Sequence, residues 1–228
     1  SVVSVNQDAG FSIVSYTGNN TSGSTVGHGL GKTPAMIIIK SRTSSSPGNW
    51  IVLHKGNTSI SSYSNTSTFT LSGYNNITLL NATNAQLNYS HDVQVNGASP
   101  NTYIAYCWAE IEGFSKFGSY VGNGNADGPA VYCGFKPAWV MVKNASDTGG
   151  RDWGINDSSR SATNPTLAHL KPNQAEIENS GLASDTYTID ILSNGFKVRN
   201  TTGIWNGSGN TMIFAAFAES PFSYSNSK

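Results

Sequence analysis

The sequence predicts an all-β protein built from two tandem, sequence-related β-sandwich repeats that pack together. Three observations point to this fold class: motifs that recur in order, short apolar runs separated by turn residues, and little charge. Charged residues make up 11% of the chain, against roughly 25% in typical soluble domains. Ser, Thr, Asn and Gly take their place, which is typical of strands joined by many turns under a neutral surface.

The duplication is seen in two pairs of motifs. Lys32–Lys40 (KTPAMIIIK) matches Phe135–Lys143 (FKPAWVMVK), 103 residues further on. Thr102–Glu110 (TYIAYCWAE) returns as Thr211–Glu219 (TMIFAAFAE), 109 residues further on. The order is the same in both halves, so we expect one unit of just over a hundred residues to occur twice.

Alternating and short continuous apolar runs between turn residues predict the strands. In the first repeat, residues 1–112, we expect strands at 11–17, 35–41, 49–54, 67–72, 76–80 and 102–112. In the second repeat, residues 113–228, we expect strands at 114–121, 130–132, 138–143, 152–156, 187–192, 195–199 and 211–219. Asn194-Gly195 is a pair favoured in tight hairpin turns.

Runs without a polar alternate face indicate inner strands, covered on both sides. Trp50 and Trp153 lie 103 residues apart at matching points inside strands, so we expect both to be core or inter-sheet aromatics. In the two closing motifs we expect burial of Ile104, Tyr106, Trp108, Ile213, Ala215 and Phe217. Truncating Trp108 to Ala would then cost roughly 3–5 kcal/mol.

The charge balance and hydropathy exclude several kinds of partner. The formal net charge is zero, which predicts no nucleic-acid partner. No apolar run reaches the roughly 20 residues of a membrane helix, so no membrane insertion is expected. Cys107 and Cys133 do not form a disulfide framework, and free thiols are expected.

Carboxylates and histidines offer no complete catalytic set. Glu110 and Glu112 would lie about 6.5–7 Å apart on one strand face, near the spacing of a glycosidase acid/base pair. However, Glu110 recurs as Glu219, where no second carboxylate follows, so a structural hydrogen bond explains the position better. The histidines lack metal-ligand spacing and are expected at the surface or in loops. We predict a non-enzymatic protein without cofactors.

One loop imitates the start of a calcium site. Asn123, Asn125 and Asp127 place oxygen ligands at alternate positions before a glycine, but the twelfth position of the loop is Gly134 rather than Glu. A turn is expected there rather than a metal, although the loop stays the weak metal candidate.

Aromatic residues beside amides are candidates for binding sugar, because a ring stacks on the sugar while the amide hydrogen-bonds its hydroxyls. Trp205 lies in a loop flanked by Gly and Asn, next to Asn206. Tyr74 with Asn75, and Tyr63, are similar candidates in the first repeat. The competing interpretation is that each ring folds back onto the sandwich.

Three segments resemble a repeated domain found in virion structural proteins of tailed phages, often marine ones. The most specific is Glu112–Lys143 (EGFSKFGSYVGNGNADGPAVYCGFKPAWVMVK), supported by Val26–Lys40 and Thr102–Glu110. The resemblance covers almost the whole chain. It implies jelly-roll or lectin-like β-sandwich modules on tail fibres or other exposed parts of the virion, and it carries over no catalytic residues.

The resemblance implies a location on the virion surface, outside the host cell. The expected partners are other virion subunits, with homo-oligomerisation. A host-surface glycan is a further expected partner, because a neutral surface rich in Ser, Thr, Asn and Gly is compatible with sugars. Two further classes stay open: a capsid decoration or filament subunit without ligand binding, and a polysaccharide depolymerase.

Overall fold

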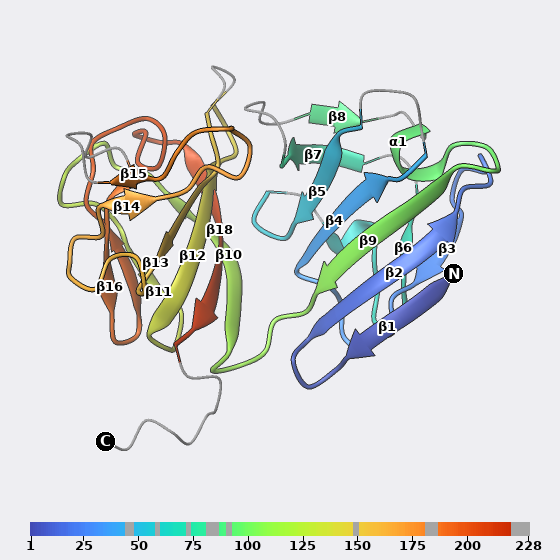
Figure 1. The fold of residues 1–228 in the computed structure, drawn as a ribbon, viewed down its shortest axis with the longest axis horizontal. Coiled ribbons are helices and arrows are strands. Elements are labelled where there is room, and N and C mark those ends of the chain that lie inside the picture. Colours follow the sequence, from blue (N-terminus) through green and yellow to red (C-terminus); the bar gives the residue numbers. More distant parts are fainter. Residues whose placement is uncertain are drawn as a thin grey trace. The chain divides into compact units, whose positions relative to one another are not determined.

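The structure is a computed structural model that describes residues 1–43, 48–57, 60–71, 74–80, 87–89, 93–147, 151–180 and 187–219. The chain forms two compact units, unit 1 (Ser1–Glu110) and unit 2 (Ile111–Lys228). The regular structure is nearly all β (Figure 1), which confirms the predicted all-β class. Among the described residues, helix is limited to a 3-10 turn, η1 (Ile60–Ser62), and one α-helical turn, α1 (Val93–Asn96). Neither of these is long and apolar enough to cross a membrane.

Unit 1 contains a seven-stranded antiparallel sheet in the order β1-β2-β9-β4-β5-β7-β8, and a two-stranded sheet, β3-β6. Its strands are β1 (Val2–Asn6), β2 (Phe11–Thr17), β3 (Thr25–Gly27), β4 (Met36–Ser41), β5 (Trp50–His54), β6 (Thr68–Thr70), β7 (Tyr74–Leu79), β8 (Leu87–Tyr89) and β9 (Thr102–Trp108). Val26 and Phe69 of the small sheet share one buried cluster with Ile37 of the large sheet. The core of unit 1 therefore lies between the two sheets.

Unit 2 contains sheets in the orders β10-β18-β12-β13, β11-β17-β16 and β14-β15. Its strands are β10 (Ser115–Val121), β11 (Ala130–Tyr132), β12 (Pro137–Asn144), β13 (Gly154–Asp157), β14 (Ala168–His169), β15 (Asn179–Ser180), β16 (Ile189–Leu192), β17 (Gly195–Val198) and β18 (Thr211–Ala218). Val131 and Phe196 of the three-stranded sheet share a buried cluster with Val140 of the four-stranded sheet. Strands β16 and β17 form the hairpin predicted from Asn194-Gly195.

The larger sheets of the two units have a common strand order. The order β2-β9-β4-β5 in unit 1 corresponds to β10-β18-β12-β13 in unit 2. The register agrees as well, because Ile38 pairs with Tyr106 in unit 1 and Met141 pairs with Ala215 in unit 2. Ile38 and Met141 lie 103 residues apart, and Tyr106 and Ala215 lie 109 residues apart, which are the separations of the repeated motifs.

The expectation that Ile104, Tyr106 and Trp108 are buried is wrong for β9. These side chains lie on the face opposite the core and are partly exposed. The buried set consists of Tyr103, Ala105 and Cys107. A strand without polar residues does not reveal in its sequence which alternate side chains face the core.

The remaining predictions for the closing motifs and the tryptophans have mixed outcomes. Ile213 and Ala215 are buried as expected, whereas Phe217 is partly exposed. Trp153 is buried, but Trp50 is only half-buried and belongs to neither core cluster, so the prediction of a core position is wrong for Trp50.

Candidate functional site

Trp205 lies in the interior of unit 2, which makes its expected role as an exposed sugar-stacking residue wrong. Its side chain is 0% exposed, and its ring meets Tyr187 edge-on with centroids 5.4 Å apart. The indole Nε1 has no hydrogen-bond partner among the described residues. Its neighbours in sequence indicate a loop, but burial of a large aromatic surface stabilises the inward position.

Asn206 is also fully buried, and its side chain joins the loop at 122–129 to its own loop at 199–210. Its Nδ2 donates to the Asn123 Oδ1 at 3.0 Å, the Asn125 carbonyl at 2.7 Å and the Asn200 carbonyl at 2.6 Å. Its Oδ1 accepts the Asn123 N–H at 2.8 Å. With its amide fully used inside the unit, Asn206 is not free to bind a sugar, and the prediction that it does so is wrong.

A similar arrangement occurs in unit 1 around Asn96. Its Oδ1 accepts the Asn19 N–H, and its Nδ2 donates to the Thr21 carbonyl, each at 3.0 Å. In both units a buried tyrosine hydroxyl donates to the carbonyl of the residue before this asparagine, at 2.8 Å from Tyr16 and from Tyr120. The shared Asn-Gly dipeptides at 96–97 and 206–207 are a signal in the sequence that would have marked Trp205 as a core residue.

Of the three candidates in unit 1, Tyr63 is the one whose side chain the structure describes. Tyr63 is half-buried and packs against the core of unit 1, in line with the interpretation of a ring folded inward. Tyr74 and Asn75 begin β7, but their side chains lie outside the described residues.

The loop at 123–127 is a set of turns closed by its own side chains. The Asn123 Oδ1 accepts the Asn125 N–H, and the Asn125 Oδ1 accepts the Asp127 N–H. The Asp127 carboxylate pairs with the Lys197 Nζ at 2.6 Å, and this partner lowers the pKa of Asp127. The oxygens that would hold a metal are therefore engaged within unit 2. No group of three or more His, Cys, Asp or Glu side chains suited to a metal occurs in the described part of the chain.

Surface or loop positions were expected for the histidines; His54 and His169 instead lie in the strands β5 and β14, His28 lies in a loop as expected, and His91 is outside the described residues. His28, His54 and His169 are all buried. The His28 Nδ1 accepts the Leu30 N–H at 3.2 Å, and burial lowers the pKa of this ring. Cys107 and Cys133 are buried free thiols, as predicted, and burial raises the pKa of Cys107 to about 12.

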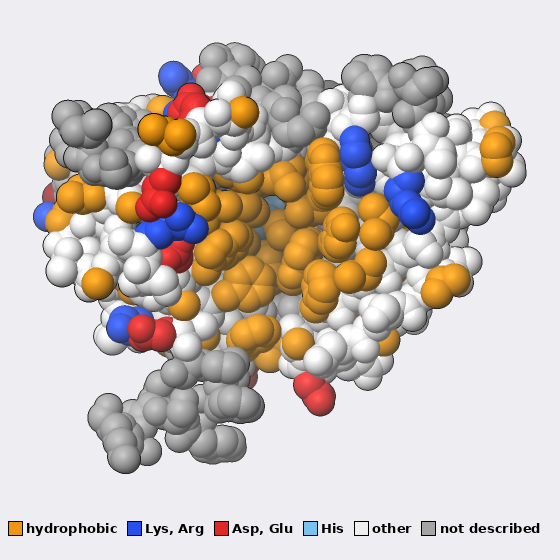
Figure 2. All heavy atoms as spheres, viewed as in Figure 1, with side chains coloured by type: hydrophobic (Ala, Val, Ile, Leu, Met, Phe, Trp, Pro, Cys, Tyr) orange, Lys and Arg blue, Asp and Glu red, His pale blue; other side chains and the backbone are white. Residues whose placement is uncertain are grey.

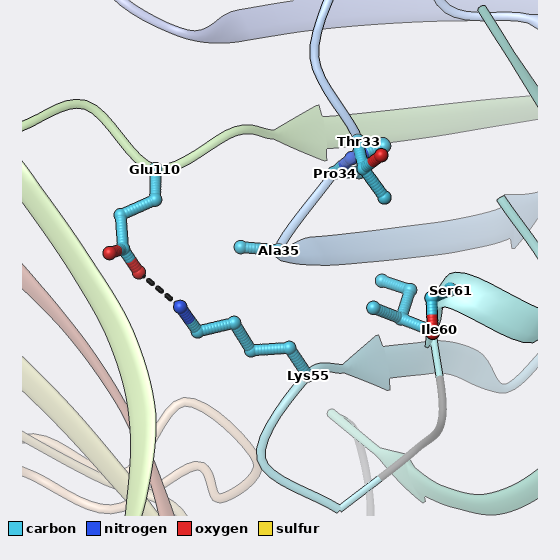
Figure 3. Close-up of a pocket in the computed structure, with 7 residues that line it drawn as sticks. All are labelled: Thr33, Pro34, Ala35, Lys55, Ile60, Ser61 and Glu110. Carbon is cyan, nitrogen blue, oxygen red and sulfur yellow. Dashed lines mark hydrogen bonds and ion pairs between the residues drawn. The ribbon is translucent and has the colours of Figure 1, made fainter. Parts of the chain in front are cut away.

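Glu110 pairs with the Lys55 amine at the mouth of a pocket of about 370 Å³ in unit 1 (Figure 3). The pocket is lined by Thr33, Pro34, Ala35, Lys55, Ile60, Ser61 and Glu110. In unit 2, Glu219 pairs with Lys136 at 2.7 Å, so the repeated carboxylate holds an ion pair in both units. The pocket has hydroxyl, amine and carboxylate groups but one carboxylate only, so an acid/base pair is incomplete among its lining residues.

A row of aromatic rings crosses the outer face of the large sheet of unit 1. The Trp50 and Tyr106 rings lie 6.3 Å apart at 14°, and the Tyr106 and Trp108 rings lie 6.4 Å apart at 29°. Phe11 extends the row beyond Trp108, with centroids 5.1 Å apart. All four side chains are partly exposed, and hydrophobic side chains gather over this sheet in Figure 2. We name Phe11, Trp50, Tyr106 and Trp108 the aromatic row.

The corresponding face of unit 2 has a different ring geometry. Phe217 is met by Phe114 at 64°, by Phe117 at 90° and by Trp139 at 55°. Rings at steep angles pack edge to face, as in a cluster. The rings of the aromatic row in unit 1 are instead nearly parallel to one another. The aromatic row could not be expected from the sequence once Tyr106 and Trp108 were predicted to face the core.

The two β units, with an aromatic face on the large sheet of unit 1, define an all-β protein. The family model of a domain of unknown function, DUF7483, matches residues 1–221. The chain therefore belongs to the DUF7483 family. No curated protein and no solved structure matches it.

Proposed function

We propose that this chain is a non-enzymatic structural module of a tailed-phage virion, exposed on a tail fibre or another surface part, that attaches to host-surface glycan. In this proposal units 1 and 2 are two copies of one β-sandwich repeat. Supporting observations are the common strand order of their larger sheets and the common offsets of the paired motifs. The resemblance of Glu112–Lys143 to tailed-phage virion domains supports the location.

The aromatic row is the observation that carries glycan binding. Aromatic rings bury the apolar faces of sugar rings without needing charge, and the row combines three near-parallel rings with the Tyr106 hydroxyl. The chain has zero net charge, which suits a neutral polysaccharide better than an acidic one. Each contact is weak, but many copies on a virion would raise the avidity.

The test is binding of the purified chain, displayed on beads in many copies, to immobilised neutral polysaccharides and to host cells. We expect Tyr106→Ala and Trp108→Ala each to weaken binding about 2- to 10-fold, equivalent to roughly 0.5–1.5 kcal/mol. Trp139→Ala in unit 2 is the matched control and should leave binding unchanged. Wild-type beads that bind neither glycan nor cells would refute attachment.

The second candidate is a capsid decoration or filament subunit, in which a protein surface covers the aromatic row. The apolar character of the aromatic row favours contact with a protein surface as much as it favours contact with a glycan. Iodide quenching of Trp50 and Trp108 fluorescence, in variants that lack the other tryptophans, separates the two. Quenching in the free chain and protection by glycan support attachment, whereas protection in the assembled particle alone supports the structural subunit.

A further inference from the structure

Strand β1 forms one edge of the seven-stranded sheet (Figure 1). It pairs with β2 over its whole length, from Val2 opposite Ser15 to Asn6 opposite Phe11, without a register shift. All five residues of β1 are exposed. Because alternate residues of an edge strand direct their N–H and C=O groups away from the neighbouring strand, β1 presents a template for another strand.

The other sheet edges in the described part of the chain are blunted. Strands β10, β13 and β16 carry Lys116, Asp157 and Asp190 respectively, and the remaining edge strands have three residues or fewer. Charge and short length are devices that protect an edge from pairing. Strand β1, with the sequence VVSVN, has five residues and carries no charge, proline or bulge.

The side chains of β1 add apolar surface to the open edge. Val2, Val3 and Val5 are 73%, 37% and 43% exposed. Val3 and Val5 lie against Gly29, where an added Cβ would approach them to 3.1 and 3.3 Å. The Gln7 side chain donates to the Gly29 carbonyl at 2.7 Å, which holds this loop beside the strand. The edge is therefore held in an extended form before any partner binds.

We propose that β1 pairs with β1 of a second copy of this chain, antiparallel and centred on Ser4, so that one sheet continues across the dimer. In this register Val3 of one copy lies opposite Val5 of the other, and Val2 lies opposite Asn6. A two-fold arrangement places the same strand against itself, and the uncharged sequence allows this without repulsion. The proposal does not depend on glycan attachment.

Cysteine cross-linking tests the register. With Ser4→Cys, the two thiols lie directly opposite each other, and mild oxidation should give a covalent dimer. Val2→Cys is the matched control, because position 2 is highly exposed. In this register position 2 of one chain lies about 14 Å from position 2 of the other, so little cross-linking is expected. Equal cross-linking of both variants, or none with Ser4→Cys, would overturn the proposed register.

Charge substitutions test the dimer itself by sedimentation velocity. Wild type should be dimeric at high concentration. Val3→Lys combined with Val5→Lys places lysines opposite each other and should give a monomer, whereas Val3→Lys combined with Val5→Glu should stay dimeric. Val121→Lys, on the exposed edge of unit 2, should match wild type, and circular dichroism should show that all variants are folded. A monomeric wild type, or two double variants that behave alike, would contradict the proposal.

Discussion

Asn206 is the side chain whose removal should disturb the loops of unit 2 most. Asn206→Ala leaves the Asn200 carbonyl without its partner in a buried position, and the Asn123 N–H and the Asn125 carbonyl without theirs in part-buried positions. Unsatisfied buried groups are costly, so we expect the free energy of unfolding to fall by about 2–3 kcal/mol. Urea denaturation followed by tryptophan fluorescence measures this change.

Asn125→Ala is the matched control, because its exposed side chain accepts only the Asp127 N–H at 2.9 Å in the loop. Its effect should stay within about 1 kcal/mol. Similar losses in the two variants would show that Asn206 does not hold the loops together.

Lys143 should make stability depend on pH in the alkaline range. Its Nζ donates to the Arg151 carbonyl, and burial lowers its pKa to about 8 in the folded chain, while Asp152 and Asp147 partly oppose the shift. The unfolded chain keeps this proton up to about pH 10.4, so between these values the unfolded state binds more protons and stability rises with pH.

The expected increase from Lys143 is about 2–3 kcal/mol between pH 7 and pH 10. It is measured as the difference between wild type and Lys143→Met in urea unfolding at each pH. Lys40→Met, at the corresponding position of unit 1, is the matched control variant. If Lys143→Met retains the full pH dependence of wild type, another group is responsible.

Truncating two aromatic residues on opposite faces of β9 should lower the free energy of unfolding by unequal amounts. Tyr103 is fully buried, its ring stacks on that of Tyr16 with centroids 5.2 Å apart, and its hydroxyl accepts the Gly97 N–H at 2.7 Å. We expect Tyr103→Ala to cost about 3–5 kcal/mol, whereas Trp108→Ala on the outer face should cost about 1–2 kcal/mol. Thermal unfolding of the two variants checks this order, and a larger loss for Trp108→Ala would mean that the outer face is buried in solution.

Strand positions could be predicted where an apolar run is bounded by turn residues. β2 and β11 match their expected bounds, and β12 begins at Pro137, where the missing N–H does not weaken the ladder. Strand β1 was not predicted, because five exposed residues with no buried face give no periodic signal. The phase of β9 could not be predicted because both of its faces are apolar.

The candidate site was less predictable than the strands. Ring geometry at Trp50 and Tyr106 depends on pairing across β4, which joins residues 56 positions apart. The ion pair of Glu110 agrees with the structural role predicted for it, but its partner Lys55 was not foreseen, because Glu219 uses Lys136 from a different place in the repeat.

At the scale of the molecule, we expect residues 1–110 and 111–228 to fold when expressed separately. Each unit has its own large sheet, smaller sheet and buried cluster. Each should therefore give a β-type circular dichroism spectrum and a cooperative thermal transition. A non-cooperative transition in either half would show that its cluster alone is too small to sustain the fold.

The amide network around Asn206 has a consequence for the motions of the chain. The segment from Asn123 to Asp127 lies outside the strands, yet the Asn123 N–H is bound by the Asn206 side chain and the Gly124 N–H by the Asn206 carbonyl. Opening these bonds requires moving the loop away from a fully buried residue. In hydrogen–deuterium exchange these two loop amides should be protected nearly as long as those of β18, so that an apparent loop behaves as part of the slowest-opening unit.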